Sequence, residues 1–207
     1  TTLFRSWKQT LLTVPVRTIA HFIRVSKQSL DDVAQLQSMI DGRMSLGLQI
    51  AEDYQLLNGL GTGQDLTGLV TASKAYNRTT GGDTKLDALR RAYTQVRLSE
   101  YTADGVILNP ADWEAIELLK GTDTRYVWVN VNDGGIARLW RMNVVDTTAM
   151  AGTKFLVGAF GMGAQLFDRQ NATIEVFEQD GTNVRENMVT IRAEERLARS
   201  EEHTSEL

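Results

Sequence analysis

The sequence of 207 residues contains no cysteine, only two histidines and only two prolines. Without cysteine the chain can form neither a disulfide framework nor a thiolate metal site, which is compatible with a reducing compartment. The two histidines, His21 and His203, lie far apart in the sequence, so we assign no metal site and no cofactor. A Ser-His-Asp triad is not expected either, because His21 lies in a strand-like segment with Ile19 and Ile23, where a packed or interfacial histidine is typical.

Long apolar runs and an excess of positive charge are also absent. No apolar run reaches the roughly 18 residues of a membrane-spanning helix, and the N-terminal residues lack the core of a signal peptide, so no membrane partner is expected. The net charge of −4 argues against a basic face that grips nucleic acid. Hydrophobic residues make up 42% of the chain, which is enough for one large or two modest domains.

The longest helical pattern in the chain runs from about residue 30 to residue 58. Its apolar residues recur every three or four positions and form one stripe of Val33, Leu36, Ile40, Met44, Leu48 and Ala51. Ser29 is a suitable N-cap, and Asn58 followed by Gly59 predicts a left-handed stop. At ~1.5 Å per residue the helix is a rod of roughly 40 Å, so we expect a flat, extended protein built along it.

Five glycines within and after this helix carry two different predictions. Gly42 and Gly47, inside the helix, are expected to be positions of close contact that cost it some intrinsic stability. Gly59, Gly61 and Gly63 resemble a phosphate-binding loop, which would make the chain a small nucleotide-binding enzyme. A dinucleotide-binding loop follows a strand, however, whereas this one follows a long helix, and no Lys-Ser pair completes a P-loop. We therefore interpret these three glycines as the turn at the exit of the helix.

The rest of the chain mixes helices and strands. We expect a strand over residues 10–24, where Pro15 is tolerated only at an edge or a start, and helices over residues 83–100 and 110–119. Further strands are expected over residues 105–108, 125–131, 136–145, 155–160, 165–167, 172–177 and 187–193, with a turn at residues 132–135. Because these elements do not form a βαβ repeat, the fold class is α+β.

One acidic group invites comparison with a metal site. Glu114 and Glu117 lie at helical spacing on a solvated face, and Asp123 follows them without a fourth ligand. We interpret the three carboxylates as structural.

The two ends of the chain differ from the patterned region between them. TTLFRS at the start and RSEEHTSEL at the end lack apolar periodicity, and with suitable codons both back-translate into the two strands of a common sequencing adapter. We therefore expect residues 1–6 and 199–207 to be non-native tails that pack against nothing, with the native part running from about Trp7 to Ala198. The alternative is a pair of ordinary frayed termini.

Four segments of the chain are distinctive: VRTIAHFIRVSKQSLDD, QLLNGLGTGQDLTGL, GVILNPADWEAIELLK and ENMVTIRAEERLA. Together they resemble the major capsid protein of tailed double-stranded-DNA phages of the Hong Kong 97 type. They occur in the order of the family, and the resemblance covers nearly all of residues 14–198. It implies a fold in which the long helix and a long sheet form a peripheral domain of residues 7–58 and 169–198. Residues 59–168 would form an inserted axial domain, with the turn at Gly134-Gly135 near its tip and Asp180-Gly181 in the loop of the peripheral domain.

The resemblance implies a structural protein and not an enzyme. It would assemble into the hexamers and pentamers of an icosahedral head shell and enclose phage DNA without specific binding. The expected partners are other copies, a scaffold segment or protein, a portal and a maturation protease; the expected location is the virion, after assembly in the host bacterial cytoplasm. The N-terminal arm and extended hairpin loop of the family are expected to be absent or cut to a stub.

A shell of the encapsulin type, which encloses enzyme cargo, is the alternative within the same fold. Neighbouring genes would separate the two functions. Portal, protease and terminase genes would indicate a phage, and an isolated cargo gene would indicate a compartment.

Asn187 and Glu194 match the positions that, in cross-linking members of the family, supply the amide acceptor and the catalytic carboxylate of a lysine–asparagine isopeptide bond. A glutamate in apolar surroundings suits the deprotonation of a lysine amine near neutral pH. In a regular strand, their separation of seven residues places the two side chains on opposite faces and about 23 Å apart, so the reaction would need neighbouring copies. The alternative is that Asn187 is an ordinary strand residue and Glu194 the partner of a basic side chain.

The donor lysine in the family belongs to the extended loop. Lys8 lies too close to the start of the first expected strand to replace it. The chain as it stands is therefore expected not to cross-link.

Overall fold

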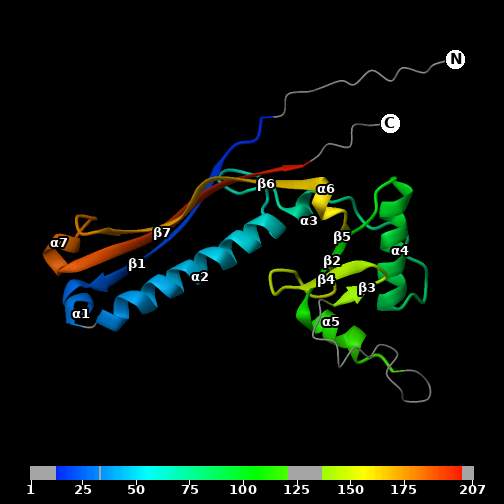
Figure 1. The fold of residues 1–207 in the computed structure, drawn as a ribbon, viewed down its shortest axis with the longest axis horizontal. Helices are drawn as coiled ribbons and strands as arrows, with labels where there is room; N and C mark the ends of the chain where they lie inside the picture. The colour runs from blue at the N-terminus through cyan, green and yellow to red at the C-terminus, as the bar shows by residue number, and fades with distance from the viewer. Residues whose placement is uncertain (1–12, 33, 121–136, 202–207) are drawn as a thin grey trace.

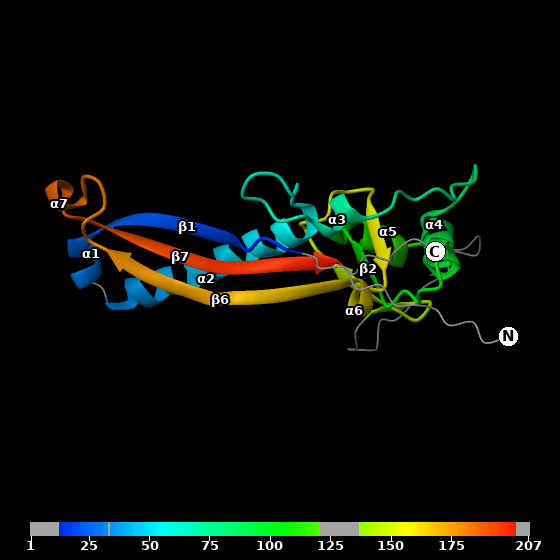
Figure 2. The same cartoon turned by 90° about the horizontal axis from the view of Figure 1, so that it is seen from above.

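The computed structural model describes residues 13–32, 34–120 and 137–201, apart from the side chains of residues 32–35 and 201. The molecule is elongated: a long sheet lies along helix α2 (Ala34–Asn58), and a smaller sheet with its own helices follows beyond the end of that helix (Figure 1, Figure 2). The expected strand 125–131 with its turn at 132–135, and the expected tail segments 1–6 and 202–207, lie outside the described residues.

The long sheet consists of three antiparallel strands in the order β1-β7-β6. Their bounds are Arg17–Ser26 for β1, Ala164–Phe177 for β6 and Met188–Glu201 for β7. β1 begins and ends later than the predicted range of residues 10–24. Its position at the edge of the sheet, two residues after Pro15, agrees with the prediction that this proline is tolerated only at an edge or a start.

The predicted long helix is present as α1 (Lys27–Asp32) and α2 (Ala34–Asn58), on either side of Val33, which lies outside the described residues. The helical segment begins at Lys27, directly after β1, so Ser29 lies inside α1 and the prediction that it is the N-cap is wrong. The backbone N–H of Lys27 is donated instead to the carbonyl oxygen of Asn187 at 3.0 Å. A backbone group of a distant turn therefore replaces the expected side-chain cap.

The helix stops at Asn58 as predicted, but the mechanism of the stop differs. Among the described residues with positive φ, neither Asn58 nor Gly59 is found, so the predicted left-handed stop is wrong. Gly59 is required for a different reason: a Cβ atom there would clash with the backbone carbonyl oxygens of Gln55 and Leu66. Close approach of the chain to itself, and not the sign of φ, selects glycine at this position.

α2 packs against the long sheet through the stripe predicted from the sequence. Ile40, Met44 and Leu48 are buried in one hydrophobic cluster with alternate residues of the central strand, Val189, Ile191 and Ala193. Because side chains alternate along a strand, β7 turns its odd-numbered residues toward α2 and its even-numbered residues toward the outer face of the sheet. In Figure 2 the three strands run along the length of the helix.

The two glycines inside α2 behave differently. A Cβ atom at Gly47 would lie 3.1 Å from Nε2 of His21 on β1, so Gly47 is a position of close contact, as predicted. Nothing lies within 4 Å of the corresponding position at Gly42, so the prediction of close contact is wrong there. The contact with Gly47 also makes His21 a packed histidine between strand and helix.

β6 is one strand, whereas the sequence predicted two, over residues 165–167 and 172–177. Its register with β7 shifts between Asp168 and Gln170 and again between Gln170 and Thr173, so the strand is irregular without being broken. The expected boundary between the axial and peripheral domains, after Asp168, falls inside this strand.

β7 extends beyond the expected end of the native chain at Ala198. Residues 199–201 pair with residues 164–166 of β6, and Arg199 is buried. The prediction that residues 199–207 pack against nothing is therefore wrong for residues 199–201.

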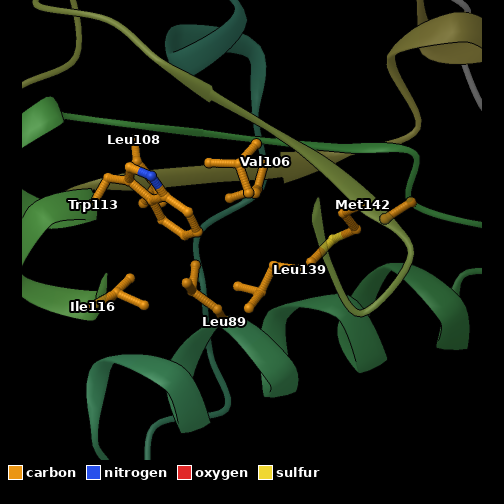
Figure 3. Packing of buried hydrophobic residues seen from close by; sticks show 9 residues of the cluster. Leu89, Val106, Leu108, Trp113, Ile116, Leu139 and Met142 are labelled. Carbon is orange, nitrogen blue, oxygen red and sulfur yellow. The ribbon is translucent and has the colours of Figure 1, made fainter. Parts of the chain in front are cut away.

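The smaller sheet has four strands in the order β3-β4-β2-β5. The strand bounds are Gly105–Leu108 for β2, Arg138–Leu139 for β3, Met142–Asp146 for β4 and Phe155–Gly158 for β5. Helices α4 (Lys85–Leu98) and α5 (Pro110–Glu117) supply residues to its hydrophobic core, with Trp113 and Ile116 from α5 and Leu89 from α4 (Figure 3). Both helices begin close to their predicted starts: α4 begins after a capping box at Thr84, and α5 begins with Asn109 followed by Pro110.

The predicted strand over residues 136–145 is interrupted by a turn. Trp140 and Arg141 have φ values of 45° and 76°, and the chain reverses there between β3 and β4. Tight turns with positive φ usually carry Gly, Asn or Asp, and neither residue here belongs to that group. The prediction of one continuous strand was wrong because no turn residue marks this reversal.

Three short helices and one anchored loop complete the described fold. The helices are α3 (Leu69–Ala72), α6 (Phe160–Gly163) and α7 (Asn183–Glu186). Between β4 and β5, the carbonyl of Ala149 accepts a hydrogen bond from the side-chain amide of Asn58, and the carbonyl of Met150 accepts one from Asn109, both at 2.7 Å. This loop therefore joins the end of α2 to the start of α5.

Candidate functional site

Asn187, the residue expected to accept a lysine, lies in the turn between α7 and β7. It is exposed and has a left-handed backbone, with φ 52° and ψ 44°. Its N–H is donated to the carbonyl of Asn183, and its own carbonyl accepts from Lys27. The interpretation of Asn187 as a strand residue is wrong, because β7 begins at Met188. Asparagine tolerates the left-handed conformation better than most residues, which suits it to this position.

A polar network holds the turn that carries Asn187. Asn183 is fully buried, and its amide nitrogen donates to Oγ1 of Thr190 on β7 at 2.7 Å. Its Oδ1 accepts from Nε of Arg24 on β1 at 3.1 Å. Arg24 also forms an ion pair with Glu186 at 2.9 Å. Side chains from two strands therefore fix the position of Asn187 through its neighbours.

Glu194, the residue expected to act as the base, lies in the middle of β7 on the outer face of the sheet. Its side chain is 22% exposed, and its Oε2 is 3.2 Å from Nη2 of Arg192. The same nitrogen is 3.2 Å from Oε2 of Glu175 on β6, and the guanidinium carbon lies 4.8 Å from the ring centre of Phe177. The expectation of apolar surroundings for Glu194 is wrong. As the alternative interpretation proposed, Glu194 has a basic partner.

One chain does not bring Asn187 and Glu194 together. Six strand steps separate Met188 from Glu194, which at ~3.3 Å per residue is about 20 Å. Asn187 precedes the strand, so the predicted alternation of faces does not describe it. The separation alone supports a composite site built from different copies.

Sequence reasoning missed a buried carboxyl group next to Glu194. Glu195 is 7% exposed on the α2 side of β7, and its Oε1 has no hydrogen-bond partner in the described part of the chain. Burial, followed by the charges of Glu52 and Asp168, raises the pKa of Glu195 to about 7. The alternation of β7 could have revealed this group, because position 195 continues the apolar series Val189, Ile191 and Ala193.

The glycine-rich turn after α2 is not arranged as a phosphate site. The N–H groups of Gly59 and Gly61 are donated to the carbonyls of Gln55 and Leu66 at 2.9 Å, and that of Gly68 to the carbonyl of Gly59 at 2.7 Å. Free backbone amides are what a phosphate-binding loop supplies, and those of Gly59 and Gly61, two of the three candidate glycines, are already used. The arrangement supports a helix-exit turn.

The described residues contain no group of His, Asp and Glu side chains arranged to hold a metal ion. Glu114 and Glu117 are exposed, and Asp123 lies outside the described residues. None of the described helices is both long enough and apolar enough to cross a membrane.

The sequence model of the phage capsid family matches residues 6–200. The chain belongs to the phage capsid family. Within this family, the major capsid protein of Enterobacteria phage HK97 is 44% identical over 188 residues, which make up 90% of this chain and 49% of the relative. The chain therefore spans about half the length of this curated relative.

Solved structures similar to this member of the phage capsid family include the capsid of an empty GTA particle. That structure has a TM-score of 0.73 and 20% sequence identity, over 92% of this chain and 71% of its own. A structure from Microbacterium phage Oxtober96 has a TM-score of 0.72 and 14% identity, over 91% of this chain and 67% of its own. At these identities the likeness concerns the fold, and the expected α+β fold of the Hong Kong 97 type is confirmed.

Proposed function

We propose that the chain is part of a major capsid protein, which assembles with copies of itself into the hexamers and pentamers of an icosahedral head shell around phage double-stranded DNA. The observation that carries this proposal is the 44% identity to the HK97 major capsid protein along 90% of the chain. A scaffold segment or protein, a portal and a maturation protease are the partners that we propose. Assembly would take place in the host bacterial cytoplasm, and the virion is the final location.

The surface of the described molecule supports assembly with other copies. Phe22 on β1, Ile50 on α2 and Val184 on α7 are 68%, 59% and 74% exposed. Burial of these side chains against other copies would remove apolar surface from water, which favours association. The net charge of −4 suits a shell that encloses DNA without gripping it.

Residues 7–58 and 169–198 form the peripheral domain in this proposal, and residues 59–168 form the axial domain. Two separate hydrophobic clusters support the division: one lies between α2 and the long sheet, and the other lies between α4, α5 and the smaller sheet. β6 crosses the boundary, because it enters the long sheet at Ala164.

In the assembled shell, Asn187 and Glu194 from different copies would take part in an isopeptide cross-link. The amine nitrogen of a lysine attacks the side-chain carbonyl carbon of Asn187, and Glu194 accepts a proton from that nitrogen. The bond between this carbon and the Asn187 amide nitrogen then breaks. The nitrogen takes up the proton and leaves as ammonia, and the new amide bond joins the two copies. The exposed side chain of Asn187 supports this role.

Electron microscopy of the full-length protein, produced with its N-terminal segment restored, tests the shell function. We expect closed icosahedral particles. A protein that stays monomeric under all assembly conditions would overturn the proposal.

Denaturing gels of mature shells test the cross-link separately. We expect ladders of covalent multimers that disappear with Asn187→Asp and with Glu194→Ala. Mature wild-type shells without ladders would contradict the cross-link and leave the shell function standing.

A further inference from the structure

We propose that Arg192 restrains the cross-linking reaction, because it occupies the place beside Glu194 that the lysine of a neighbouring copy must take. The inference rests on the proposed cross-link and adds a control on its rate. Arg192 would be a positioning residue, since it acts through Glu194 and forms no bond with the reacting atoms.

The geometry places one guanidinium group between two carboxylates. Nη2 of Arg192 lies 3.2 Å from Oε2 of Glu194 on its own strand and 3.2 Å from Oε2 of Glu175 on the neighbouring strand. The guanidinium carbon also lies 4.8 Å from the centre of the Phe177 ring, a cation–π contact that favours this position. Glu175 and Glu194 therefore share a single cation.

The strand register fixes this arrangement. Residue 192 pairs with Glu175 on one side and Phe22 on the other, while Glu194 pairs with Thr173 and Ala20. The uncharged residues opposite Glu194 offer it no other ion pair across the sheet. Arg196, two residues further along the same face, forms no ion pair with Glu194 among the described contacts.

The shared cation opposes the approach of a lysine in two ways. A lysine arrives as an ammonium ion and must give one proton to the carboxylate of Glu194 before its nitrogen can attack Asn187. While Arg192 is ion-paired with Glu194, the carboxylate that would receive this proton already holds a cation. The positive charge of Arg192 also repels the arriving ammonium ion. When the guanidinium turns to Glu175 alone, the carboxylate of Glu194 becomes free to accept the proton, and the repulsion of the ammonium ion is weakened.

Glu175 competes with Glu194 for Arg192, and it thus sets how often Glu194 is free to accept a proton from the lysine. This predicts opposite effects for the two partners of Arg192. Arg192→Gln removes the competing cation, and we expect ladders to form about two- to fivefold faster, the size that fits loss of one partly exposed ion pair. Glu175→Gln leaves Arg192 with Glu194 as its one carboxylate partner in this set, and we expect ladders to form more slowly by a similar factor.

The test is a time course of ladder formation on denaturing gels, made with full-length shells whose assembly has first been checked by electron microscopy. Arg192→Lys keeps the positive charge and should restore a rate close to wild type. Arg196→Gln is the matched control, because it removes the same charge from the same strand and face, and its rate should equal wild type. If the substitutions acted merely by perturbing the sheet, each of these variants would cross-link more slowly than wild type.

The outcomes separate the inference from the proposed cross-link. Ladders in wild type that form at the same rate in Arg192→Gln, or faster in Glu175→Gln, overturn the role of Arg192 and leave the cross-link standing. If neither wild type nor Arg192→Gln forms ladders, both the inference and the cross-link are overturned, and only the shell function stands.

Discussion

Glu195 on β7 and Glu52 on α2 are two carboxyl groups on facing elements at the contact between the long sheet and the helix. Burial, then the charges of Glu52 and Asp168, raises the pKa of Glu195 to about 7 from its ordinary value of 4.5. Burial is also the first cause of the raised pKa of Glu52, followed by the charges of Asp168 and Asp53. The contact between helix and sheet therefore favours the protonated form of Glu195.

The stability of the protein should depend on pH through this group. Because the pKa of Glu195 is higher in the folded state, its contribution is fully present below about pH 4.5 and is lost as the pH rises through about 7. Glu195→Gln mimics the protonated form, so its melting temperature should fall less than that of wild type across this window. Glu52→Gln removes one of the charges that raise the pKa of Glu195, so the stability lost across this pH window should be smaller. If the melting temperatures of wild type and Glu195→Gln fall by the same amount as the pH rises, the raised pKa of Glu195 is contradicted.

Replacing Ile40 or Leu48 by Ala should cost roughly 2 to 5 kcal/mol of unfolding free energy, because each side chain is buried between α2 and β7. Ile50→Ala on the same helix is the matched control, since Ile50 is exposed, and it should change the free energy by no more than about 0.5 kcal/mol. Urea unfolding measures all three. Equal losses at positions 48 and 50 would show that the helix buries a different face.

Alanine at the two glycines of α2 should have opposite effects. Gly42→Ala should stabilise the protein by about 0.5 to 1 kcal/mol, because the position is open and alanine favours the helix. Gly47→Ala should destabilise it by about 1 kcal/mol, because the new methyl group meets Nε2 and Cε1 of His21 at 3.1 and 3.2 Å. Gly47→Ala combined with His21→Ala should recover most of the loss. A stabilising Gly47→Ala would show that His21 moves aside freely.

Truncation after Ala198 should destabilise the protein, whatever the origin of the residues beyond it. It removes the pairs that residues 199–201 form with residues 164–166, together with the buried side chain of Arg199. We expect a loss of about 1 to 3 kcal/mol from these backbone hydrogen bonds and the lost burial. The control is truncation after Glu201, which should leave the melting temperature unchanged. Identical melting temperatures for both truncations would restore the prediction that residues 199–207 pack against nothing.

The features that the sequence predicted correctly are those that neighbouring residues determine. Asn109 and Pro110 start α5, Thr84 caps α4, and the spacing of Ile40, Met44 and Leu48 fixes the buried face of α2. Each of these signals lies within a few residues of the structure that it specifies.

Other features depend on contacts between distant residues, and the sequence did not predict them. The turn at Trp140 and Arg141 has no local signal, and its strands are set by pairing in the smaller sheet. The continuity of β6 through two register shifts depends on its pairing with β7. At the candidate site, Asn187 and Glu194 were identified through the family resemblance and not through a local pattern. The proximity of Arg192 to Glu175 follows from strand register, which the sequence does not reveal.

The loop between β4 and β5 has a mechanical consequence. The side chains of Asn58 and Asn109 donate to the adjacent carbonyls of Ala149 and Met150, so the last turn of α2 is attached to the smaller sheet. A tilt of the smaller sheet would therefore turn α2 about this attached end. Its 25 residues give an arm of about 37 Å, so a tilt of about 10° at the pivot displaces the far end by about 6 Å. That end carries α1 and α7 and, beside them, Asn187 (Figure 1). In the proposed shell, a small tilt of the smaller sheet would therefore move Asn187 by several ångströms relative to a neighbouring copy.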